Sequence, residues 1–157
     1  EAIATLNQIK RCYYFVCPMP AKDIFHNAIR SSLIKDGWQI TDDPLFIKAS
    51  TRISLYIDIG GERAIGAEKD GKKIAVEIKS FLGMSPLAEF HTALRQFLNY
   101  LLALRINYPE RVLYLAITED IYRDFFSDPF VQLSVSTYRV KLLIFNPSEE
   151  AIISWKD

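Results

Sequence analysis

The chain has 157 residues, half of them hydrophobic, and its 19 Lys and Arg residues balance 19 Asp and Glu residues. This composition excludes intrinsic disorder and predicts one globular domain that builds its core without disulfides or structural metals. A net charge of zero excludes a protein that coats nucleic acid or anionic membrane by bulk charge, so any nucleic-acid contact must be local.

The cysteines and the hydropathy of the chain indicate its compartment. Cys12 and Cys17 are the only cysteines, too few for a tetrahedral zinc site or for the disulfide framework of a secreted domain. No apolar stretch reaches transmembrane length, and the apolar run around residues 12–17 is too short for a signal peptide. We therefore expect a cytoplasmic protein in which residues 1–18 form an extension and residues 19–157 a single domain.

The first half of this domain has the pattern of a helix followed by strands. Apolar residues recur at helical spacing from Pro20 to a stop at Gly37, which predicts the first helix. Strand-like segments follow at 38–40 and 45–47, and residues 53–59 alternate between apolar and polar. Residues 65–69 and 74–78 form a further pair of strands, and Asp70-Gly71 between them suits a tight hairpin turn.

The second half begins with a long helix. Ser85 and Pro86 supply an N-cap and a first-turn proline for a helix over roughly 86–106. Residues 111–117 are continuously apolar, which is typical of a parallel strand buried on both faces. Short helices broken near Asp128 follow over 119–137, and strands at 141–145 and 152–155 close the chain. This order predicts an α/β (α+β) fold, a mixed central β-sheet flanked by helices.

Two carboxylates occupy otherwise apolar strands, Asp58 within 53–59 and Glu77 within 74–78. A chain reversal near Asp70 would bring them together, where a divalent cation such as Mg²⁺ or Mn²⁺ would relieve their repulsion. Lys79 lies on the same strand face as Glu77 because side chains alternate along a strand. A metal-bound water beside a lysine suits phosphodiester hydrolysis, with Asp58 and Glu77 as metal ligands and Lys79 as the electrostatic aid.

The same residues also fit a structural interpretation. Glu77 and Lys79 would then form an exposed ion pair on the hairpin, worth about 0–1 kcal/mol, and Asp58 would mark a strand end. The helix that follows carries Gln96 and Tyr100 four residues apart, on one helical face, which favours the catalytic interpretation. Local positive charge for a DNA approach, or for a solvated surface, is available from Lys69, Lys72, Lys73, Arg95 and Arg105.

Asp58 followed by Glu77-Ile78-Lys79 resembles the PD-(D/E)XK nuclease superfamily, with Ile57 in place of the proline in that name. The resemblance implies a restriction-endonuclease-like core and a deoxyribonuclease that uses Mg²⁺ or Mn²⁺. In that superfamily an Asp lies on the second strand of a three-stranded meander, and Glu-x-Lys on the third. Active enzymes and inactive relatives share this fold, so the fold by itself does not establish activity.

Two further features resemble the RecB-like and Cas4-like branch of that superfamily. Gln96 and Tyr100 are similar to its Q-x-x-x-Y motif, which contacts DNA or supports the site. His26 looks like a histidine that can complete the metal site there. Asp23, His26 and Arg30 also fit a solvated helix face, so the sequence leaves both roles of His26 open.

Longer segments resemble the XisH family, the fdxN element excision controlling factors of cyanobacteria, from Met19 to Trp155. The resemblance implies a part in programmed excision of a DNA element by a separate recombinase, together with a small partner, XisI. One function that follows is metal-dependent DNA cleavage. The alternative is a non-catalytic accessory that binds an XisI-like partner or DNA and so licenses the recombinase; whether the chain forms a homo-oligomer stays open. The matching segments are 19–26, 35–38, 43–44, 55–58, 75–83, 89–94 and 96–100.

Overall fold

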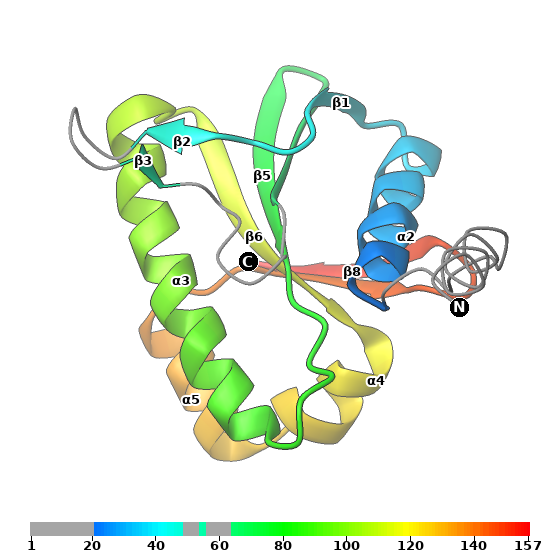
Figure 1. Ribbon diagram of the computed structural model, residues 1–157, viewed down its shortest axis with the longest axis vertical. Helices are drawn as coiled ribbons and strands as arrows, with labels where there is room; N and C mark the ends of the chain where they lie inside the picture. The colour runs from blue at the N-terminus through cyan, green and yellow to red at the C-terminus, as the bar shows by residue number, and fades with distance from the viewer. Residues whose placement is uncertain (1–20, 49–53, 56–63) are drawn as a thin grey trace, which may run out of the picture.

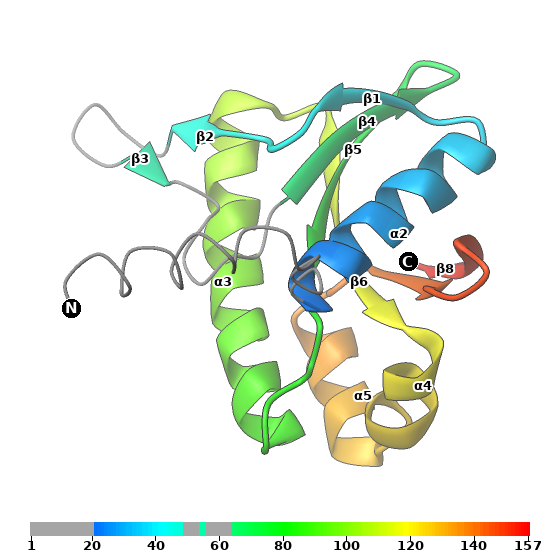
Figure 2. The same ribbon diagram turned by 45° about the vertical axis from the view of Figure 1, so that its right-hand side comes forward.

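A computed structural model describes residues 21–48, 54–55 and 64–157. Its centre is a mixed sheet in the order β1-β4-β5-β6-β7-β8 with helices on both faces (Figures 1 and 2), which confirms the predicted sheet flanked by helices. The elements are α2 (Ala21–Lys35), β1 (Gln39–Asp42), β2 (Ile47–Lys48), β3 (Ser54–Leu55), β4 (Ala64–Lys69), β5 (Lys72–Ile78), α3 (Pro86–Asn107), β6 (Arg111–Thr118), α4 (Glu119–Ile121), the π-helix η2 (Tyr122–Phe126), α5 (Pro129–Thr137), β7 (Leu142–Asn146) and β8 (Ala151–Lys156).

The hairpin of β4 and β5 has the tight turn that the sequence predicts. Asp70 and Gly71 have φ angles of 51° and 76°. Positive φ at both central residues is typical of a type I′ turn, whose twist matches that of the paired strands. The turn fixes a register in which Ala64 lies opposite Glu77.

The helix α3 begins at the predicted N-cap and connects β5 to a parallel strand, as predicted. The Ser85 hydroxyl accepts a hydrogen bond from the Ala88 N–H at 3.3 Å, and Pro86 occupies the first turn. Phe90 and Phe97 bury their rings between this helix and the sheet. The crossover delivers β6 parallel to β5, at the centre of the sheet.

Successive side chains of β5 enter two separate cores. Ala75 packs into the core on the α3 side of the sheet. Val76 and Ile78 pack into the core on the α2 side, with Ile29 and other apolar residues of α2. The predicted alternation along this strand is therefore confirmed, and it determines which face carries the polar residues.

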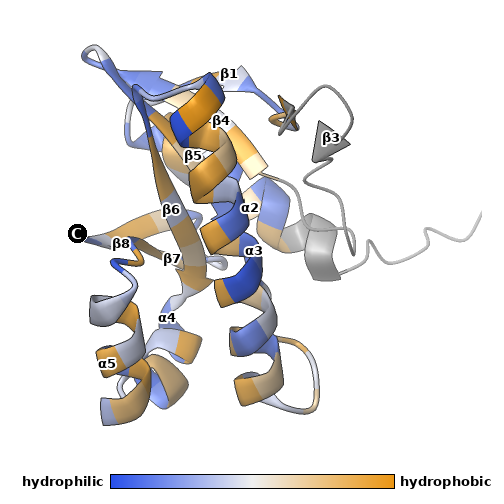
Figure 3. Cartoon of the chain, turned by 90° about the vertical axis from the view of Figure 1, so that its left-hand side faces the viewer, coloured by the Kyte–Doolittle hydropathy of each residue, from blue (hydrophilic) through white to orange (hydrophobic). Residues whose placement is uncertain are grey.

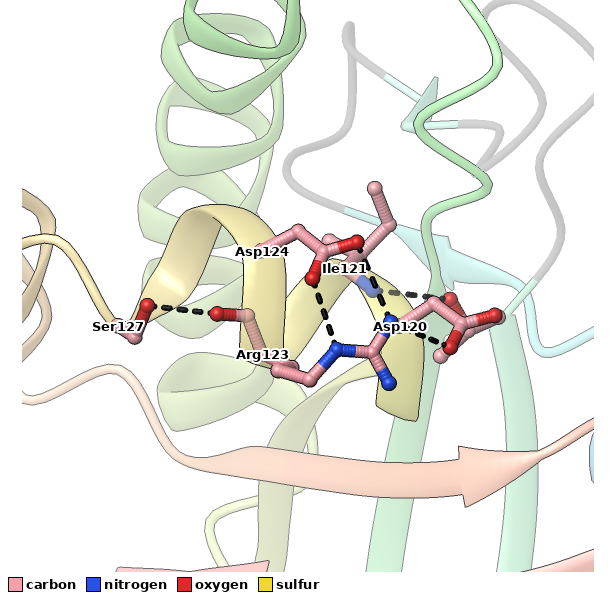
Figure 4. Close-up of polar contacts among 6 residues, drawn as sticks. Asp120, Ile121, Arg123, Asp124 and Ser127 are labelled. Carbon is pink, nitrogen blue, oxygen red and sulfur yellow. Dashed lines mark hydrogen bonds and ion pairs between the residues drawn. The ribbon is translucent and has the colours of Figure 1, made fainter.

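The segment between β6 and β7 is helical, as predicted, and includes the π-helix η2. Arg123 bonds to the carboxylates of Asp120 and Asp124 at 2.9 and 2.8 Å (Figure 4). These ion pairs are exposed and contribute little to stability. Phe126, which is fully buried, fixes the segment against the sheet, and the Asp128 carboxylate caps the next helix, α5.

The region before β4 is described only in part. Of the alternating residues 53–59, the structure describes only β3, and Leu55 there pairs with Ile47 of β2 in a separate two-stranded sheet. Asp58 and the extension 1–18 lie outside the described residues. The division of the chain into residues 1–18 and 19–157 therefore stays a prediction.

Near the last strand, Tyr114 and Lys141 both donate hydrogen bonds to Oδ1 of Asp157, at 2.9 and 2.7 Å. Burial of the phenol, followed by its bond to Asp157, raises the pKa of Tyr114 from 10.0 to about 12. The Lys141 ammonium is the main cause that lowers the pKa of Asp157. This cluster ties β6 to the end of the chain.

The raised pKa of Tyr114 predicts a loss of stability at high pH. The folded protein holds the phenol proton more tightly than the unfolded chain, so this contribution is complete below pH 10.0 and is lost as the pH rises toward about 12. The phenolate absorbance of wild type minus that of Tyr114→Phe should give the pKa. Asp157→Ala should lower it only part of the way to 10.0, because burial is the larger cause. Full return to 10.0 would contradict this ranking.

Candidate active site

Glu77 and Lys79 lie on the central strand and at its end, on the face covered by α3. Their positions two and four residues after Ala75 place them on the same side of β5 as that residue. The two residues are only 2% and 8% exposed. The interpretation as an exposed ion pair on a hairpin surface therefore does not hold for these two residues.

The backbone around both residues is held on two sides. Glu77 lies between Ala64 of β4 and Leu115 of β6 in the sheet register. The Lys79 N–H donates to the Ala116 carbonyl at 3.0 Å, which extends the pairing beyond β5. Burying a carboxylate is unfavourable unless a cation or hydrogen bonds compensate it, and an ammonium two residues along the same face is such a group. The sheet thus presents the two charges at a rigid position.

The turn after Lys79 contains a backbone conformation that no sequence pattern predicts. Phe81 is a buried phenylalanine with a φ of 50°, a conformation that bulky residues rarely adopt. Its ring packs edge-on against Phe126, with centroids 5.5 Å apart, and lies 6.1 Å from Phe125. These contacts hold the strained backbone, and so fix the chain two residues beyond Lys79.

Gln96 and Tyr100 lie on α3, the helix packed over the face that carries Glu77. Tyr100 belongs to the same core as Ala75 and is buried, and Gln96 is half-buried one turn before it. The predicted shared helical face therefore turns toward the sheet. Their role at the site stays a prediction.

Asp58, the predicted second metal ligand, lies outside the described residues. The described chain resumes at Ala64, whose partner on β5 is Glu77. His26 lies on α2, which packs on the opposite face of the sheet. Its Nε2 is 2.7 Å from Oδ1 of Asp43, and Nε of Arg30 is 3.3 Å from the other oxygen of that carboxylate. Metal ligation by His26 therefore stays a prediction.

The donor set at Glu77 fits a hard divalent cation. Mg²⁺ and Mn²⁺ are typically held by one or two carboxylates, with water and substrate phosphate oxygens as further ligands. Within the described part of the chain, no three His, Cys, Asp or Glu side chains form a group that could hold a metal. Metal ligation by Glu77 and Asp58 therefore stays a prediction, and of these two residues only Glu77 lies in the described part of the chain.

The hairpin lysines lie far from this site. Lys72 and Lys73 begin β5, whereas Glu77 lies near its end, so about 13–17 Å of strand separates them at the usual rise per residue. Lys69 donates to the carbonyl oxygen of Asp36 and lies 3.3 Å from the carboxylate of the same residue. Their role in a DNA approach stays a prediction.

A model of the family described as XisH protein matches residues 19–153. The chain belongs to the XisH family. A crystal structure of an XisH family protein from Nostoc punctiforme PCC 73102 has 45% sequence identity to the chain and a TM-score of 0.78. The match covers 85% of this chain and 99% of that protein. The resemblance to the XisH family is therefore confirmed.

A second crystal structure is similar to this chain. It is that of an fdxN element excision controlling factor protein from Anabaena variabilis, with 45% identity, a TM-score of 0.78, and coverage of 86% of this chain and 99% of that one. No curated protein matches the chain. Among the described helices, none combines the length and the apolar character needed to cross a bilayer.

Proposed function

We propose that this XisH protein is a metal-dependent DNA endonuclease of the PD-(D/E)XK type that acts in the excision of a DNA element. The observation that carries the proposal is the burial of two opposite charges on the face covered by α3, Glu77 near the end of the central strand β5 and Lys79 just beyond it. The helix α2, the meander of β1, β4 and β5, the helix α3 and the strand β6 follow the order of that superfamily's core, but the predicted ligand Asp58 comes before β4, which is the second strand of this meander. An ordinary surface hairpin has no reason to bury two opposite charges.

Each residue has a defined part in the proposed reaction. Glu77 and Asp58 would hold Mg²⁺ or Mn²⁺, which supplies Lewis-acid polarisation of the phosphodiester and a more acidic water. Lys79 would orient the attacking water and offset negative charge that develops on the phosphate. Because Lys79 as a residue is largely buried, its charge is less screened than that of a surface lysine. Gln96 and Tyr100 would contact the DNA or support these groups from α3.

The test is cleavage by the purified full chain. Labelled duplex, single-stranded and branched DNA are incubated with Mg²⁺ or Mn²⁺, with and without a small XisI-like partner. We expect cleavage that requires the metal and stops with a chelator. If no DNA is cleaved in any lane, including those with the partner, the proposal is overturned and the non-catalytic accessory is favoured.

The second candidate is a non-catalytic accessory that binds an XisI-like partner or DNA and licenses a recombinase. Exposed apolar side chains on two helices favour it, since large exposed apolar surfaces mark interaction sites. Ile106 of α3 is 73% exposed, and apolar residues recur along α3 and α5 (Figure 3). The others on these helices are Leu87, Leu102, Phe130 and Leu133. Such a surface also suits a partner of an active nuclease, so the cleavage assay decides between the two.

A further inference from the structure

Three cationic side chains surround a pocket that the proposed catalytic residues do not use. The pocket has a volume of 640 Å³ and lies between the end of α5 and the paired strands β7 and β8. Arg139, Lys141 and Lys156 line it, with Asp157 as the only acidic residue among its lining residues. Because the chain as a whole has no net charge, this is a local excess of positive charge.

Two of the three cations are not neutralised within the described part of the chain. Lys141 is matched by Asp157, whose carboxylate lies 2.7 Å from its Nζ. Nζ of Lys156 lies 5.8 Å from the centroid of the Tyr122 ring, a contact that leaves its charge unchanged. Neither Lys156 nor Arg139 forms an ion pair with a residue of 21–48, 54–55 or 64–157. Both charges therefore face the pocket without a carboxylate partner among these residues.

The backbone at Arg139 gives a second, independent observation. Its N–H donates to the Ser136 carbonyl at 3.2 Å, and the Val140 N–H donates to the Val135 carbonyl at 2.9 Å. These bonds form a Schellman motif at the end of α5, and Arg139 has a φ of 52° at the position where glycine is usual. A residue with a Cβ is strained in this conformation, so the backbone favours glycine at position 139. The chain nevertheless has an arginine there, which places a guanidinium at the pocket.

We infer that this pocket binds the phosphate group of a phosphoryl compound, either free or part of a nucleic acid. An arginine fork binds two phosphate oxygens at once, and a lysine adds a point charge. The volume lies in the range of small-molecule sites and holds a nucleotide-sized ligand. The register Glu77–Leu115–Leu142–Lys156 puts Lys156 three strands from Glu77, about 14 Å at the usual strand spacing. The two sites are therefore separate.

The test is a calorimetric titration of the full chain with inorganic pyrophosphate, in chelator so that no metal binds at Glu77. We expect saturable binding that weakens roughly tenfold in Arg139→Gly and in Lys156→Gln, because each removes a charge-assisted hydrogen bond. Lys35→Gln changes an exposed lysine on α2, which pairs with Glu150 beside the opposite end of β8 from Lys156, and should bind as wild type does. No binding by wild type, or unchanged affinity in both pocket variants, would overturn the inference.

Arg139→Gly also separates ligand binding from a structural role. A cation beside a helix C-terminus has a favourable interaction with the helix dipole. If that were its only role, the glycine variant would bind pyrophosphate as wild type does, which would count against the pocket. We expect weaker binding together with a higher melting temperature, because glycine relieves the strained φ. Single-stranded DNA that displaces pyrophosphate would assign the site to nucleic-acid phosphates, and failure to displace it would assign the site to free phosphoryl compounds.

Discussion

Glu77→Gln is expected to lower metal-dependent DNA cleavage roughly 100-fold or more, with the fold retained. The substitution keeps the size of a side chain that is 2% exposed, but it removes the negative charge that would hold the metal. The measurement is the initial rate of cleavage in Mn²⁺, on whichever DNA wild type cuts best. Thermal melting by circular dichroism shows whether the variant is folded.

Two controls make this result specific. Glu110→Gln changes an exposed glutamate in the loop before β6 and should cleave as wild type does. Mn²⁺ should raise the melting temperature of wild type but not of Glu77→Gln or Asp58→Ala, because a ligand that binds only the folded state stabilises it. Cleavage by Glu77→Gln at the wild-type rate would contradict the assignment of the site.

Lys79→Met separates the electrostatic role from metal binding. We expect a similar loss of cleavage, since methionine fills most of the space of the lysine side chain with apolar atoms but carries no ammonium. The stabilisation by Mn²⁺ should remain, because Lys79 is not a ligand. A variant that loses both cleavage and the metal-induced shift would show that Lys79 acts by holding Glu77 in place.

Phe126→Ala is expected to reduce the free energy of unfolding by about 4 kcal/mol. The ring is fully buried and packs edge-on against three others, with centroids 5.5 Å from Phe81, 5.6 Å from Phe90 and 5.7 Å from Phe125. Removing it leaves a cavity that such a dense aromatic cluster fills only in part. Urea unfolding followed by circular dichroism gives the change.

The chain offers a matched control four residues further on. Phe130 is 62% exposed at the start of α5, so Phe130→Ala should change the free energy of unfolding by less than about 0.5 kcal/mol. Equal losses in the two variants would mean that both rings are buried in solution, against the packing described above. A loss below about 1 kcal/mol for Phe126→Ala would mean that the cluster repacks.

Features of the fold that depend on neighbouring residues were predictable. Asp70-Gly71 determines a type I′ turn because few residues tolerate two positive φ angles in succession. Ser85 starts α3 because its hydroxyl caps a backbone N–H of the first turn. Pro86 suits the first turn because it has no N–H that would need a partner there. The alternation from Ile74 to Ile78 follows from the geometry of a strand.

Features that depend on distant residues were not predictable. Phe81 adopts a positive φ only because rings from another helical segment surround it. The His26 ring lies within hydrogen-bond distance of the Asp43 carboxylate. It also lies on α2, the helix that covers the face of the sheet opposite to Glu77. Nothing in the composition of the chain indicates that Arg139 and Lys156, 17 positions apart, line one pocket.

The sequence by itself determined the order of elements, the family, and which strand face carries Glu77 and Lys79, because turns, caps and alternation act over a few residues. Only the tertiary structure decided that these two charges are buried, because burial depends on α3 and on strands that pack from elsewhere in the chain. That burial distinguishes a surface ion pair from the rigid, weakly screened charges on which the proposed phosphodiester hydrolysis depends.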